Sequence, residues 1–171
     1  MRKKTIQDNL KTIYDFGSFF LVECPKCSKC AKVIVSGLKD DKREFKLVCE
    51  ACGHNKSETL SVYTGYLFSA NSKNYKDKQI GIGSAVDWYF HLPLWLSIKC
   101  KGHTLWVYNP EHLKFIENHV SSKIRGQNRT DSGWRNAALS SRLPKWMQEA
   151  GNREAILKCI DKLNEKLSDC R

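Results

Sequence analysis

Three observations predict an α+β fold for this chain. Short runs of β-forming residues alternate with two Cys-x-x-Cys motifs between residues 19 and 58, as in small antiparallel β modules. Residues 85–108 are the most hydrophobic part of the chain. Two apolar runs within this range flank a Lys-Gly pair, which predicts a β-hairpin that turns at the pair. Further on, apolar residues recur at three- and four-residue steps, the period of an amphipathic helix. We therefore expect an N-terminal helix in 1–18, the β module in 19–58, and a β-hairpin and C-terminal helical domain in 59–171.

The first part of the chain predicts a helix followed by short strands. Ile6, Leu10 and Ile13 lie at helical spacing, so we expect a short amphipathic helix over residues 5–16. A glycine and dense charges in residues 36–43 predict an exposed hairpin loop. The remaining runs predict strands at 19–22, 31–35, 45–48 and 59–68, and a polar loop at 69–78.

Helix signals are clearest in the second half of the chain. Asn109 supplies an N-cap for a helix expected over residues 110–124, which begins with a proline. Asn152 is expected to cap a final helix with one apolar stripe, formed by Ile156, Ile160, Leu163 and Leu167. Between these helices, residues 132–150 predict one or two short helices broken at Pro144.

Four cysteines have the spacing of a metal site: Cys24, Cys27, Cys49 and Cys52. A Cys-x-x-Cys motif supplies two thiolates from one tight turn, and two such motifs complete a tetrahedron around zinc at about 2.3 Å. The 21 residues between the motifs are about the length of two strands and a loop, which is the spacing of a zinc ribbon. Four thiolates leave no open coordination position, so we predict one structural Zn²⁺ ion that does not activate water.

The position of Cys30 leaves a second ligand set open. Cys27 and Cys30 also form a Cys-x-x-Cys motif, so the first pair of ligands can be shifted by three residues. After the second motif, Gly53 suits a turn with a positive backbone angle. We expect His54 to pack over the site rather than to bind the metal.

The eight cysteines also allow disulfide bonds, as in small secreted proteins. The start, Met-Arg-Lys-Lys, is followed by polar residues instead of the apolar core of a signal peptide. No segment approaches the roughly 18 uninterrupted apolar residues of a membrane span. We therefore expect a cytoplasmic protein with reduced thiolates and no membrane partner.

No residue pattern indicates catalysis, and we expect no enzymatic activity. Cys100 and His103 suggest a second metal half-site or a nucleophile pair, but no further Cys-x-x-Cys motif completes them, which favours a simple hairpin turn. His112 and His119 would lie about 10.5 Å apart on one helix, too far to bind one metal, and are expected at the surface. The Gly-Ile-Gly-Ser run at 81–84 lacks the Gly-Lys-Ser/Thr of a phosphate loop and predicts a turn. No small-molecule substrate is evident.

The chain is strongly basic, with 29 Lys and Arg against 18 Asp and Glu and a formal net charge of +11. Four thiolates with one Zn²⁺ ion would lower this charge to +9. Such a charge attracts nucleic acid or an acidic protein and does not choose between them. The basic residues are scattered along the chain, so a merely solvated surface is the third interpretation.

The cysteine motifs, Cys-Pro-Lys-Cys and Cys-Glu-Ala-Cys-Gly-His, resemble the zinc ribbons of transcription factor IIB over about 35 residues. More of the chain is similar to a group of bacterial zinc-ribbon proteins of the transcription factor IIB type, through residues 92–96, 103–109 and 142–147. The resemblance implies a zinc-binding module within one continuous architecture. It implies no particular activity.

Two functions agree with these observations. The ribbon, the charge and aromatic residues beside basic ones, as at Trp134-Arg135 and Lys145-Trp146, indicate a DNA- or RNA-binding or transcription-associated factor. The alternative is a protein-interaction module, such as an immunity protein or antitoxin that neutralises an acidic toxin. We expect nucleic acid or an acidic protein as the partner.

Overall fold

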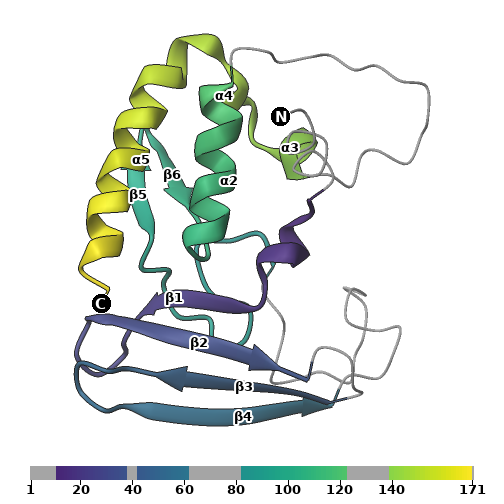
Figure 1. Cartoon of the computed structure of the whole chain (residues 1–171), viewed down its shortest axis with the longest axis vertical. Coiled ribbons are helices and arrows are strands. Elements are labelled where there is room, and N and C mark those ends of the chain that lie inside the picture. Colours follow the sequence, from purple (N-terminus) through teal and green to yellow (C-terminus); the bar gives the residue numbers. More distant parts are fainter. Residues whose placement is uncertain (1–10, 38–41, 62–81, 123–138, 171) are drawn as a thin grey trace, which may run out of the picture.

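The computed structural model describes residues 11–37, 42–61, 82–122 and 139–170. It confirms the α+β fold class, with a four-stranded sheet, a two-stranded sheet and helices that follow them (Figure 1). In chain order the elements are η1 (Ile13–Phe16), β1 (Phe19–Glu23), β2 (Cys30–Ser36), β3 (Lys42–Val48), β4 (Asn55–Ser61), β5 (Ser97–Cys100), β6 (His103–Trp106), α2 (Pro110–Ser121), α3 (Leu139–Arg142), α4 (Lys145–Gln148), η3 (Ala150–Asn152) and α5 (Arg153–Ser168).

The larger sheet is an antiparallel meander in the order β1-β2-β3-β4. Its register pairs Phe20 with Val33 and Val35 with Phe45, so these four apolar side chains share one face. In β2, buried and exposed residues alternate, as expected for a strand with one face in the core. The three strands predicted at residues 19–48 are confirmed, while β4 begins at Asn55, four residues before its predicted start.

An aromatic segment covers the apolar face of this sheet. The ring of Phe45 stacks on Tyr89 at 4.6 Å between centroids, and Phe20 lies 5.2 Å from Trp88. Asp87, which is fully buried, accepts hydrogen bonds from the amides of Tyr89 and Phe90 at 2.8 Å and fixes this segment. One apolar cluster therefore runs from the sheet into the second half of the chain.

The predicted hairpin is confirmed in β5 and β6. Lys101 and Gly102 form its turn with φ angles of 53° and 79°. Two positive φ angles in a two-residue turn match the twist of the flanking strands, and glycine adopts the second angle without strain.

The helix predicted to start after Asn109 is confirmed as α2. The Asn109 side chain accepts a hydrogen bond from the His112 amide at 3.0 Å, and Pro110 occupies the first turn. α2 ends at Ser121, and residues 123–124 of the predicted helix lie outside the described ranges.

The last helices also follow the prediction, with one correction. α3 and α4 are separated at Leu143 and Pro144, as expected. Asn152 precedes α5 but its side chain does not cap it; its amide nitrogen donates to the Trp146 carbonyl at 2.9 Å instead. Figure 1 shows α5 beside α2, above the edge of the sheet formed by β1.

The N-terminal helix is shorter than expected in the part that the structure describes. Instead of an amphipathic α-helix to residue 16, a 3-10 turn spans Ile13–Phe16, and residues 5–10 of the prediction lie outside the described ranges. The predicted strand residues 62–68 and the loop 69–78 also lie outside them. None of the helices in the described ranges combines the length and the apolar character that crossing a membrane requires.

Candidate metal centre

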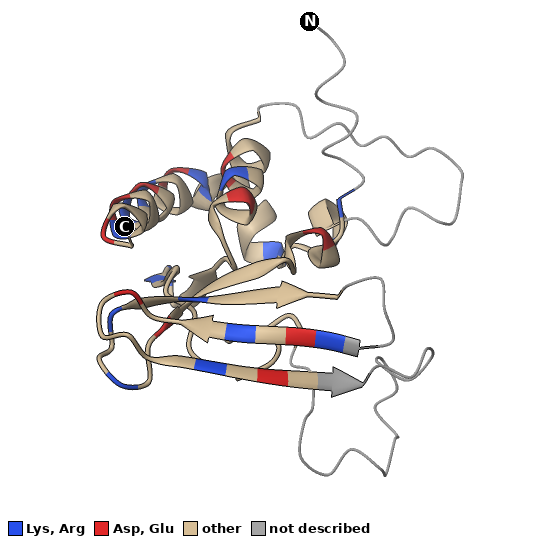
Figure 2. Cartoon of the chain, turned by 60° about the horizontal axis from the view of Figure 1, so that its bottom comes forward, with Lys and Arg blue, Asp and Glu red and all other residues tan. Residues whose placement is uncertain are grey.

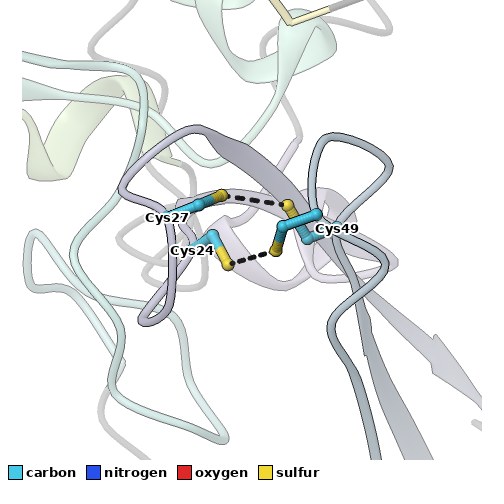
Figure 3. Close-up of side chains that lie close together, drawn as sticks. Cys24, Cys27 and Cys49 are labelled. Carbon is cyan, nitrogen blue, oxygen red and sulfur yellow. Dashed lines mark hydrogen bonds between the residues drawn. The ribbon is translucent and has the colours of Figure 1, made fainter.

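Two cysteine turns meet at one end of the four-stranded sheet. The first follows β1 and contains Cys24 and Cys27, and the second follows β3 and contains Cys49 and Cys52. Because β1 and β3 are both antiparallel to β2, they run in the same direction, and their last residues lie at the same end of the sheet. The sheet topology therefore brings together two motifs that are distant in sequence (Figure 3).

The first turn is closed by two backbone hydrogen bonds. The Ser28 amide donates to the Cys24 carbonyl at 2.9 Å, and the Cys24 amide donates to the Lys29 carbonyl at 2.8 Å. Ser28 has a positive φ of 57°, which lets the chain reverse and enter β2. Cys24 and Cys27 thus present their sulfurs on one side of the turn.

The second turn repeats this pattern at the same offsets. The Gly53 amide donates to the Cys49 carbonyl at 2.9 Å, and the Cys49 amide donates to the His54 carbonyl at 2.8 Å. Gly53 takes the positive φ, 71°, that Ser28 takes in the first turn. The two turns are therefore structural copies, and His54 closes the second turn through its backbone.

The four sulfurs have the separations of a tetrahedral metal site. Sγ of Cys24 lies 3.7 Å from Sγ of Cys52, and Sγ of Cys27 lies 3.6 Å from Sγ of Cys49. All four sulfurs lie within 4.8 Å of one another. Zinc–sulfur bonds of about 2.3 Å place the corners of a tetrahedron about 3.8 Å apart. The cluster can therefore hold a metal ion, and the donor set fits zinc.

The thiols of the cluster have opposed acidities. Burial raises the pKa of Cys24, but the backbone N–H groups of Lys26 and Cys27 donate to its sulfur and lower the pKa to about 7. The Lys29 amide lowers the pKa of Cys27, whereas burial and the neighbouring thiols raise it to about 12. Four thiols this close do not all ionise without a cation among them, because each thiolate disfavours the next.

Cys30 does not join the cluster. It forms a disulfide bond with Cys170, 140 residues away, and its Cα lies 5.3 Å from that of Cys170. The expectation of reduced thiolates is therefore wrong for this pair. The alternative ligand set with Cys27 and Cys30 is also excluded, because the Cys30 sulfur is in the disulfide. No local spacing indicates this bond, because it depends on where the end of α5 meets the start of β2.

The other residues considered for a site do not converge. Cys100 is buried at the end of β5, whereas His103 is exposed and stacks on Trp146 at 4.8 Å between centroids. The prediction of a simple hairpin turn is confirmed there. Gly83, in the predicted turn, has a φ of 86° and donates its amide to the Tyr108 hydroxyl at 3.1 Å.

The expectation that His112 lies at the surface is wrong. Only 2% of this side chain is exposed, because it stacks on Phe16 at 4.7 Å between centroids. Its Nδ1 atom accepts a hydrogen bond from the Tyr108 amide at 3.3 Å. Burial lowers the pKa of His112 to about 3, so the ring is neutral. His119 is half-buried on the same helix.

Asp87 is a buried polar residue that the sequence pattern did not reveal. Its Oδ1 atom accepts the hydrogen bonds from the Tyr89 and Phe90 amides, and its Oδ2 atom accepts a third from the Leu92 amide at 2.7 Å. All of these donors are backbone groups, so Asp87 organises the segment over the sheet. Its only sequence signal is an acidic residue inside an otherwise aromatic run.

Comparison of the chain with protein-family models, with curated proteins and with solved structures finds no match.

Proposed function

We propose that this chain binds one structural Zn²⁺ ion through Cys24, Cys27, Cys49 and Cys52. The observation that carries the proposal is the pair of matched turns, whose sulfurs are 3.6 and 3.7 Å apart across the site. Tetrahedral sites made of four thiolates select zinc or iron. When bound, zinc would cross-link the ends of β1 and β3 and stabilise the folded state.

Metal analysis of the purified protein tests this proposal. We expect one zinc per chain in the wild type and less than one tenth of that in Cys49→Ser and Cys52→Ser. Cys159→Ser is the matched control, because Cys159 is a thiol outside the cluster, and it should retain full zinc. Bound iron in place of zinc, or full zinc in the two cluster variants, would contradict the proposal.

We further propose that the zinc-ribbon module contacts nucleic acid, as a DNA- or RNA-binding or transcription-associated factor of the transcription factor IIB type. Exposed lysines on and beside the cysteine turns support this proposal, namely Lys26, Lys29, Lys32 and Lys46. Lys32 and Lys46 lie on the solvent face of the sheet, where the side chain of Ile34, paired with Lys46, is 44% exposed. Figure 2 shows that acidic residues also occur on β3 and on its neighbour β4, so the charge of the sheet is mixed rather than uniform.

A salt titration of binding to random DNA and RNA tests this second proposal. If the sheet face contacts phosphates, the affinity should fall steeply with salt, and Lys32→Glu with Lys46→Glu should weaken it at least tenfold. The control is Lys158→Glu with Lys162→Glu, which makes the same charge change at two exposed positions of α5. Absence of binding at low salt would reject it and favour the alternative, a module that docks an acidic protein such as a toxin. Purification from the native host with mass spectrometry would then identify that partner.

A further inference from the structure

The eight cysteines of the chain form three groups in the structure. Four make the cluster and two make the Cys30–Cys170 bond. The remaining two, Cys100 and Cys159, are reduced and belong to elements that pack together, β5 and α5. Neither the metal centre nor the disulfide uses them.

Each of these two thiols contacts the element that carries the other. Sγ of Cys100 lies 3.8 Å from the carbonyl oxygen of Ala155, one turn before Cys159 on α5. Sγ of Cys159 lies 4.0 Å from the carbonyl oxygen of Lys99, next to Cys100 on β5. Burial and the adjacent Cys159 side chain raise the pKa of Cys100 to about 12. The two thiols are therefore neighbours across the helix–strand contact.

Cys159 lies within α5, and Cys170 lies two residues after its end. They are eleven residues apart in the sequence. Each meets a cysteine of a different sheet, Cys100 on β5 and Cys30 on β2. Figure 1 shows α5 running along β5 and ending near the start of β2.

We propose that Cys100 and Cys159 are a site of disulfide formation, oxidised by a low-molecular-weight disulfide such as glutathione disulfide. With Cys30–Cys170 the new bond makes two covalent attachments, one within α5 and one just after its end. We call the two bonds together the α5 clasp. It fastens a helix whose apolar side chains, Ile156, Ile160 and Leu163, already fill the core.

The reaction proceeds by two exchange steps. The half-buried Cys159 reacts first: its thiolate attacks one sulfur of glutathione disulfide, and one glutathione thiolate leaves. Cys100 then gives up its proton and attacks the Cys159 sulfur of the mixed disulfide, and the second glutathione leaves as a thiolate. Two protein thiols are oxidised, one disulfide is reduced to two glutathione thiols, and the two protons pass to those thiols.

The test uses the 171-residue chain, loaded with zinc, in a glutathione redox buffer. Thiols are trapped by alkylation after acid quenching, and disulfide-linked peptides are identified by mass spectrometry without reduction. We expect a peptide pair linked through Cys100 and Cys159, the loss of two alkylatable thiols, and unchanged zinc. Alkylation of both cysteines in oxidised protein that retains Cys30–Cys170 would overturn the proposal, as would a stable glutathione adduct on Cys159.

Two variants separate the clasp from nonspecific oxidation. Cys159→Ser should lose the Cys100 link and keep Cys30–Cys170, whereas Cys170→Ser should keep the Cys100–Cys159 link. Oxidation should also raise the urea midpoint of the wild type but not that of Cys159→Ser, because only the wild type gains a bond. Equal midpoint shifts in the two proteins, or scrambled links in Cys170→Ser, would contradict the assignment.

Discussion

The side-chain amide of Asn109 donates a hydrogen bond of 2.8 Å to the backbone carbonyl of Phe16. The same nitrogen donates to the Phe19 carbonyl at 2.9 Å, while the side-chain oxygen accepts from the His112 amide at 3.0 Å. One fully buried side chain therefore caps α2 and anchors the segment that leads into β1. This relationship joins the start of the sheet to the helices.

Replacing Asn109 should be strongly destabilising. Asn109→Ala removes the helix cap and leaves two buried carbonyls without their donor, so we expect a loss of about 3 kcal/mol in the free energy of unfolding. Asn109→Asp keeps the acceptor for the cap but loses the donor, and should be destabilising as well. Urea denaturation measures both, and a loss in Asn109→Asp below about 0.5 kcal/mol would show that the bonds to Phe16 and Phe19 contribute little.

Asp87→Ala should lower the free energy of unfolding by about 3 kcal/mol, because three backbone amides lose their buried acceptor. Asp161→Ala, at an exposed position of α5, is the matched control and should change stability by less than about 0.5 kcal/mol. Equal effects of the two substitutions in urea denaturation would refute the role assigned to Asp87.

The neutral, buried His112 makes stability depend on pH. Its folded pKa of about 3 is below the ordinary histidine pKa of 6.5, so the unfolded state binds more protons between these values. Stability from this residue is present above pH 6.5 and falls as the pH drops toward 3, by at most about 5 kcal/mol. His112→Gln should show a flatter decline over this range.

The control for this pH effect is His103→Gln, because His103 is exposed. Unfolding by urea at several pH values should give the wild-type pH dependence for His103→Gln. If the free energy of unfolding of His112→Gln fell with pH as steeply as that of the wild type, other groups would be the cause of the acid sensitivity.

Gly17→Ala should destabilise the fold by about 2 kcal/mol through steric overlap. An added Cβ atom would lie 2.5 Å from the Trp88 ring, which is itself packed in the core. Gly151→Ala is the matched control, since its added methyl group meets nothing within 4 Å. Thermal unfolding of both variants checks this, and a neutral Gly17→Ala would show that the Trp88 ring moves freely.

Local patterns in the sequence were sufficient to predict the elements whose cause is local. The Asn109-Pro110 pair marks the start of α2, and the Lys101-Gly102 pair marks the hairpin turn, because caps and tight turns depend on adjacent residues. The two Cys-x-x-Cys turns are recognisable for the same reason. The two turns meet at one end of the sheet because a single antiparallel strand, β2, separates the strands that precede them.

The features that were not predicted depend on contacts between distant segments. Cys30 meets Cys170 because α5 ends beside β2, and no spacing in the sequence reports that. His112 is buried because Phe16, far away in the chain, stacks on it. The prediction that Asn152 caps α5 was wrong, because its side chain donates a hydrogen bond to the Trp146 carbonyl instead. Such competition among partners is settled by packing, not by local pattern. The domain boundaries at residues 18 and 58 stay a prediction.

X-ray absorption at the zinc edge of the purified, metal-loaded protein tests the central claim most directly, because it reports the atoms bound to the ion. We predict a single shell of four sulfur atoms at about 2.3 Å, with no nitrogen or oxygen ligand. Cys52→Ser should lose one sulfur from this shell or fail to bind the ion. A shell with two or fewer sulfurs in the wild type, or one containing histidine, would contradict the assignment of Cys24, Cys27, Cys49 and Cys52 as the ligands.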